Sequence, residues 1–70
     1  MEPKKQYVQI VETKINGCGG YWVPAVITPR EYSYDEEIIP GIEPTNAMGP
    51  ARVAAIVASR QLGMEYVECD

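Results

Sequence analysis

A glycine-rich run near the start of the chain constrains the fold most. Asn16-Gly17-Cys18-Gly19-Gly20 separates residues 6–15 from residues 21–28, and both flanking segments are rich in β-branched and aromatic side chains. Glycine adopts positive φ at little cost, so the pattern predicts two strands joined by a β-hairpin tip. Pro24 cannot donate a ladder hydrogen bond. We therefore expect its backbone nitrogen to face away from the first strand, and the second strand to be a sheet edge on that side.

Further prolines and glycines restrict the predicted helix to one segment of the chain. Pro40, Gly41 and Pro44 allow no helix longer than about a turn in residues 29–48, which predicts a long ordered loop. Residues 50–62 contain strong helix formers, with Gly49 as the expected N-cap and Gly63 as the expected C′ residue.

The fold class follows from these segments and a short terminal strand at residues 64–69. Because the second strand is expected to be an edge, the terminal strand should pair with the first. We predict an α+β fold, a single domain over residues 1–70 with ββαβ order. Its antiparallel sheet has three strands in the order 2-1-3, with the helix on one face and a long acidic loop.

Size and composition limit the function classes. A chain of 70 residues forms one small domain, and its 46% hydrophobic and 23% charged content is typical of a folded protein. No apolar run approaches the roughly 18 residues that span a bilayer, and the start lacks the apolar region of a secretory signal. We expect a complete cytoplasmic protein without a membrane partner.

The chain has no histidine and two cysteines, Cys18 and Cys69, which argues against catalysis. Zinc sites of the common Cys/His kinds and histidine-based triads are excluded. Thiols are normally reduced in the cytoplasm, although a disulfide between the two cysteines is geometrically possible. The glycine run leads into a strand and not a helix, so a phosphate cradle is disfavoured, and a nucleophilic Cys18 would lack a histidine base. We predict a protein that is not an enzyme and has no cofactor and no metal.

Half of the ten acidic residues gather between Glu31 and Pro44, in a stretch without a basic residue. The net charge of −4 is therefore concentrated on one connecting segment. A solvated charge run is the ordinary interpretation, and a divalent cation is a weaker one because the spacing matches no calcium loop. Six basic residues against ten acids oppose direct nucleic-acid binding. The favoured partner is a host protein or protein complex with a basic surface. The acids would bind that surface by charge complementarity, and aromatic side chains would anchor the contact. The predicted partner-binding residues are Glu31, Tyr32, Tyr34, Asp35, Glu36, Glu37, Glu43 and Trp22.

The helix carries a second apolar sector. Its expected core face is a stripe of small residues formed by Ala51, Ala54, Ala55, Ala58 and Leu62. Val53, Ile56 and Val57, beside Arg60, fall outside that stripe. One alternative is that the loop covers them with Ile38, Ile39 and Ile42. The other is that they form a homodimer or partner patch, and then the acids would serve only solubility.

The overall outline, together with the alanine-rich helix Pro50-Ala-Arg-Val-Ala-Ala-Ile-Val-Ala-Ser59 closed by Gly63, resembles small phage-encoded proteins, the anti-CRISPR proteins among them. The resemblance is one of architecture over the whole chain and carries over no functional residue. It implies a non-enzymatic inhibitor that occupies a nucleic-acid-binding surface of a bacterial defence complex.

Overall fold

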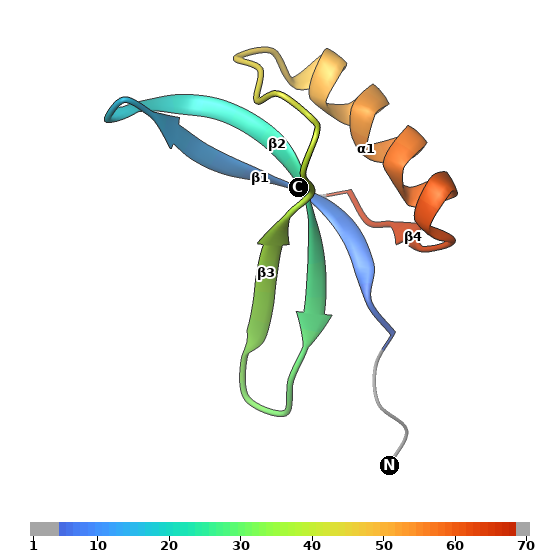
Figure 1. Ribbon diagram of the computed structural model, residues 1–70. Helices are drawn as coiled ribbons and strands as arrows, with labels where there is room; N and C mark the ends of the chain where they lie inside the picture. Colours follow the sequence, from blue (N-terminus) through green and yellow to red (C-terminus); the bar gives the residue numbers. More distant parts are fainter. Residues whose placement is uncertain (1–4, 69–70) are drawn as a thin grey trace.

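The computed structural model describes residues 5–68, and its first two strands form a long antiparallel hairpin (Figure 1). β1 (Tyr7–Ile15) pairs with β2 (Cys18–Pro29), and Ile15 lies opposite Cys18 across the turn. The two turn residues, Asn16 and Gly17, have φ values of 52° and 81°. Positive φ at both positions is the requirement of a type I′ turn, whose twist matches that of the flanking strands.

The structure corrects the expected long loop, because its first half contains a third strand. β3 (Tyr34–Ile38) pairs antiparallel with β2, so β2 is an interior strand and not an edge. The backbone of Pro24 does point away from β1, since its carbonyl accepts a hydrogen bond from the N–H of Ile39 at 3.2 Å. With no N–H to return that bond, Pro24 lies where the β2–β3 ladder ends.

The sheet has four strands and is mixed, which corrects the three-stranded antiparallel sheet of order 2-1-3. After α1 (Met48–Leu62), β4 (Glu65–Tyr66) pairs with β1, but in the parallel direction, and the strand order is β3-β2-β1-β4. β3 is antiparallel to β2 and so runs in the same direction as β1. β4 is parallel to β1, so β3 and β4 also run in the same direction, and α1 is the crossover that joins them.

The helix begins two residues earlier than expected, at Met48, with Ala47 as its N-cap. Pro50 lies in the first turn, where backbone N–H groups have no intrahelical acceptor, so its missing N–H breaks no bond. The first intrahelical bond joins the N–H of Ala51 to the carbonyl of Ala47 at 3.4 Å. Within residues 5–68, no helix is both long enough and apolar enough to cross a membrane.

Small side chains let the helix lie close to the sheet. Ala51 and Ala55 are buried against Val8 and Ile10 of β1. Ala58 is also buried, whereas the other two members of the predicted stripe, Ala54 and Leu62, are half-buried and exposed. Four larger side chains complete the packing around this cluster: Trp22, Ile39, Met64 and Tyr66.

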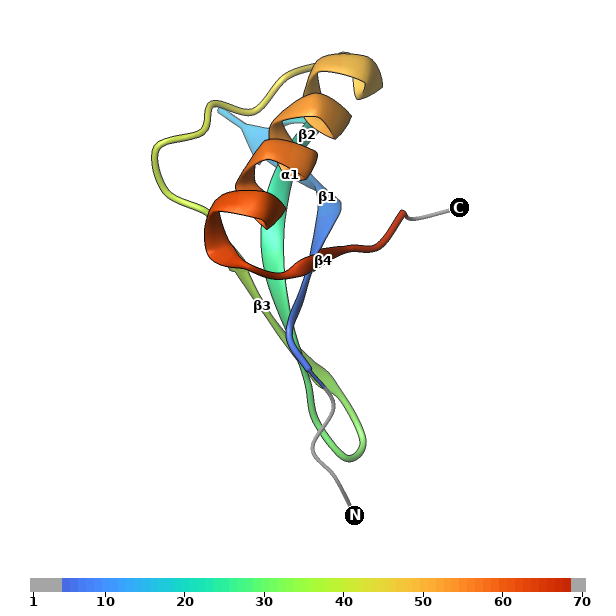
Figure 2. The same cartoon turned by 90° about the vertical axis from the view of Figure 1, so that its right-hand side faces the viewer.

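β3 stands apart from the helix. Among the named elements, β3 packs against β2 alone, while α1 packs against β1, β2 and β4. Figures 1 and 2 show the β2–β3 end of the sheet extending beyond the helix. The half of the predicted loop that became a strand therefore lies outside the helix-covered core.

Candidate partner-binding edge

The acidic residues at the centre of β3 lie on an exposed edge strand. All five residues of β3 are exposed, and within residues 5–68 β2 is its only neighbour in the sheet. Glu37 lies opposite Val26, which is itself opposite Val8 on the helix-covered face, so Glu37 and Asp35 belong to that face. Glu36 points to the opposite face because side chains alternate along a strand. The carboxylates therefore flank both sides of the edge.

The backbone of β3 has one side that pairs with no strand in the part of the chain that the structure describes. The Ser33 carbonyl accepts a hydrogen bond from the N–H of Arg30 at 2.8 Å, and the Ile39 N–H donates to Pro24, so both residues face β2. Alternate residues of a strand direct their backbone groups to the same side. Tyr34, Glu36 and Ile38 therefore direct their N–H and carbonyl groups outward, away from β2.

The three central carboxylates differ in their ion pairs. Arg30 forms an ion pair with Asp35 across the β2–β3 turn, and both side chains are exposed. Within residues 5–68, neither Glu36 nor Glu37 forms an ion pair. Two adjacent carboxylates on the edge are thus left without an ion-pair partner among the described residues.

The turn that leads into β3 brings further predicted site residues next to it. Tyr32 lies at this turn and is 93% exposed, and Tyr34 at the start of the strand is 63% exposed. Glu31 is exposed at the same turn, whereas Glu43 is exposed in the segment that follows the strand. The described surface therefore groups two tyrosines with four of the five predicted carboxylates.

Trp22 lies apart from this group. Its side chain is half-buried and packs against the core cluster under the helix. Its N–H and carbonyl groups pair with Thr45 at 2.7 and 2.9 Å, which ties the segment before the helix to the outer side of β2. The geometry gives Trp22 a packing role, and the structure does not bring it to the acidic edge.

The outer face of the helix retains apolar surface. Val53 is 63% exposed and Val57 is 48% exposed. Ile56 is half-buried and Arg60 is exposed beside them. Of the three isoleucines expected to cover this sector, Ile39 packs into the core, Ile42 is half-buried and Ile38 is exposed on β3. Cover from within the described chain is therefore incomplete.

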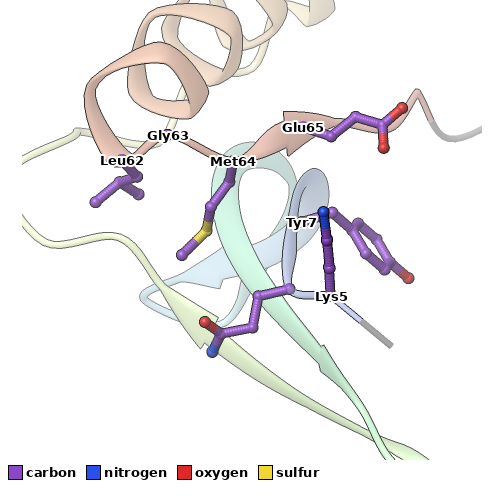
Figure 3. Close-up of a pocket in the computed structure, with 7 residues that line it drawn as sticks. Lys5, Tyr7, Leu62, Gly63, Met64 and Glu65 are labelled. Carbon is purple, nitrogen blue, oxygen red and sulfur yellow. The ribbon is translucent and has the colours of Figure 1, made fainter. Parts of the chain in front are cut away.

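A depression between the start of β1 and the end of α1 has a volume of about 500 Å³ (Figure 3). Leu62 and Met64 line it from one side and Lys5 and Tyr7 from the other. Its ionisable groups are those of Lys5, Tyr7 and Glu65.

The remaining candidate groups are the acidic and cysteine side chains. Across residues 5–68, no three histidine, cysteine or acidic side chains converge to hold a metal ion. Cys18 is a free, exposed thiol at the hairpin turn. Its partner in the disulfide considered above, Cys69, lies outside the described residues.

Sequence reasoning missed Ile38 and the outward backbone of β3. Aspartate and glutamate are depleted in strands, so Tyr34-Asp-Glu-Glu-Ile38 reads as a loop on propensity alone. A signal was present in the charges, because Arg30 and Asp35 flank a short segment and can pair only if the chain turns back between them.

Comparisons with protein-family models, with curated proteins and with solved structures found no match to this chain.

Proposed function

We propose that this protein is a non-enzymatic binding protein that uses the acidic edge strand to occupy a basic, nucleic-acid-binding surface of a host protein complex. The observation that carries the proposal is the pair of exposed carboxylates, Glu36 and Glu37, which have no ion-pair partner within residues 5–68. Carboxylates held on an ordered strand present a fixed row of negative charge. A surface built to bind phosphates is complementary to such a row.

The tyrosines beside the acids supply the apolar part of such a contact. Tyr32 and Tyr34 are the most exposed large apolar side chains next to β3. Tyrosine contributes contact area with little loss of side-chain entropy, and it is enriched among the residues that dominate binding energy. The acids would then set orientation and association rate, while the tyrosines would slow dissociation.

The test is a pull-down of the tagged protein from bacterial lysate, compared between Glu36→Lys and Glu65→Lys. Each substitution changes the net charge by the same amount, but Glu65 is an exposed residue of β4, on the opposite sheet edge. We expect Glu36→Lys to abolish capture of a nucleic-acid-handling complex and Glu65→Lys to retain it. Capture should also decline as salt rises, because exposed charges are screened. Equal capture by both variants would remove β3 from the binding surface.

The helix supports a second candidate function, a homodimeric assembly or adaptor protein. Its basis is the exposed apolar pair Val53 and Val57 on the outer face of α1. A patch of this kind on a helix is self-complementary in a two-fold dimer. In that case the wild-type protein has the mass of a dimer in sedimentation, and Val53→Glu converts it to a monomer. A monomeric wild type, or an unchanged mass after substitution, would reject this candidate.

A further inference from the structure

The outward backbone of β3 specifies how a partner would bind, beyond the charge that attracts it. Tyr34, Glu36 and Ile38 direct their N–H and carbonyl groups away from β2, and β3 lies at the end of the sheet. Unpaired groups in this arrangement are the template for adding a strand from another chain. Resting on the proposed function, we infer that β3 accepts an extended segment of the partner as a fifth strand.

The charges on β3 argue against a second copy of this chain as that strand. Antiparallel pairing of two β3 strands centred on Glu36 would place Glu36 opposite Glu36 and each Asp35 opposite a Glu37. Like charges directly opposite each other destabilise a strand pair. The same charges favour a partner strand that carries cations at those positions.

The positions of the unpaired acids define the sequence pattern of the added strand. Glu36 and Glu37 are consecutive and point to opposite faces, so their cross-strand neighbours are two consecutive residues of the partner, one on each face. Both should be lysine or arginine. Asp35 already pairs with Arg30, so the partner residue opposite Asp35 need not be basic.

Apolar side chains extend the pattern on one face. Tyr34 and Ile38 lie on the same face as Glu36, and Ile38 is 46% exposed. The partner residues opposite them should be apolar, because cross-strand pairs of aromatic and β-branched side chains stabilise a sheet. For an antiparallel partner the order is apolar, basic, basic, any residue, apolar. The occupant is therefore an extended basic segment of another protein.

The test is a titration of the isotope-labelled wild-type protein with a short capped peptide. The core of the peptide is isoleucine-lysine-lysine-threonine-valine, with threonines on both sides. A peptide of the same composition with its two lysines separated is the control for net charge. We expect the first peptide to bind more tightly and to slow amide hydrogen exchange at Tyr34, Glu36 and Ile38. Binding without slowed exchange at these three amides would overturn strand addition while leaving an acidic binding surface intact. Absence of binding by the matched peptide at low salt would overturn the inference as well.

A variant pair isolates the backbone contribution. Ile38→Pro removes one outward N–H and no carboxylate, and Ile38→Ala removes the side chain alone. We expect Ile38→Pro to weaken peptide binding about tenfold more than Ile38→Ala, which corresponds to one hydrogen bond. A peptide N-methylated at its second lysine should lose affinity for the wild-type chain by a similar factor, and this arm does not depend on the variant folding. Equal affinities throughout would show that the edge backbone takes no part. The lysate test above depends on Glu36 and not on Ile38, so the two proposals can fail separately.

Discussion

The two edges of the sheet contrast in how they are held. β4 pairs with β1 over only two residues, Glu65 and Tyr66, yet it packs against the helix, and Tyr66 contacts the core cluster. β3 pairs with β2 over five residues and packs against no other helix or strand of the described chain. The shorter edge is held by side-chain burial, and the longer edge is held mainly by its ladder.

Because they are held differently, the two edges contribute differently to the stability of the domain. Apolar burial is the dominant stabilising contribution to folding, whereas a ladder hydrogen bond in water contributes only modestly. β4 therefore contributes to the stability of the domain. β3 can carry exposed charge and an unpaired backbone because none of its five residues belongs to the side-chain cluster under the helix.

The largest expected effect compares one tyrosine from each edge. Tyr66→Ala should lower the free energy of unfolding by about 3 kcal/mol, because it removes an aromatic side chain from the core cluster. Tyr34→Ala removes an exposed side chain and should change it by about 0.5 kcal/mol or less. Urea denaturation of the two variants checks the contrast.

A conservative variant serves as the control for packing. The hydroxyl of Tyr66 is buried and has no hydrogen-bond partner among residues 5–68. Tyr66→Phe should therefore leave stability unchanged or raise it, because the desolvated hydroxyl is removed and the ring is kept. Similar losses for Tyr66→Ala and Tyr34→Ala would contradict the proposed division between the edges.

The same contrast explains how much of the fold the sequence predicts. The hairpin turn at Asn16 and Gly17 and the end of the helix at Gly63 depend on local chemistry, so local patterns reveal them. The predicted position of β4 beside β1 is confirmed, but the direction of β4 depends on whether the chain reverses once more before the helix. That reversal is β3, whose acidic residues have low strand propensity and are ordered by pairing with β2. The charge of the candidate edge is therefore visible in the sequence, while its backbone geometry depends on the pairing with β2.

The second prediction tests which side of β3 carries the ladder. Glu37 faces β2, so Glu37→Pro should break the β2–β3 ladder and lower the free energy of unfolding by about 2 kcal/mol. Ile38 faces outward, and Ile38→Pro should cost less than about 1 kcal/mol because edge strands tolerate proline there. Urea denaturation measures both costs. A reversed order of the two variants would show that the assignment of inward and outward residues is wrong.

The third prediction concerns the turn between the end of α1 and β4. Gly63 has a φ of 69°, and its N–H donates to Arg60 while the N–H of Met64 donates to Ser59. This pair of bonds is the Schellman motif, which requires a left-handed residue. Gly63→Ala should therefore cost about 1 kcal/mol. A Cβ at Gly63 would meet no other atom within 4 Å, so the cost is conformational and not steric.

Gly49 offers a matched control for this substitution. It lies in the first turn of α1 without positive φ, and a Cβ there would meet no atom within 4 Å outside the neighbouring residues. That Cβ would approach the ring of the following Pro50, which opposes the gain in helix propensity, so Gly49→Ala should change stability by about 0.5 kcal/mol or less. Thermal unfolding should therefore shift downward clearly for Gly63→Ala and little for Gly49→Ala, and equal downward shifts would contradict a conformational cost specific to Gly63.

The smallest expected effects come from one exposed ion pair at each edge. Arg30 pairs with Asp35 beside β3, and Arg52 of α1 pairs with Glu68 after β4 at 2.6 Å. All four side chains are about half exposed or more, so each double-mutant cycle should give a coupling of about 0.5 kcal/mol that declines with added salt. Equal couplings would mean that the edges differ in burial and not in surface charge. A coupling well above 1 kcal/mol for Arg30 and Asp35 alone would mean that charge, and not only the ladder, holds β3 to the sheet. The acids of β3 would then be partly structural, which would weaken the case that they are kept for a partner.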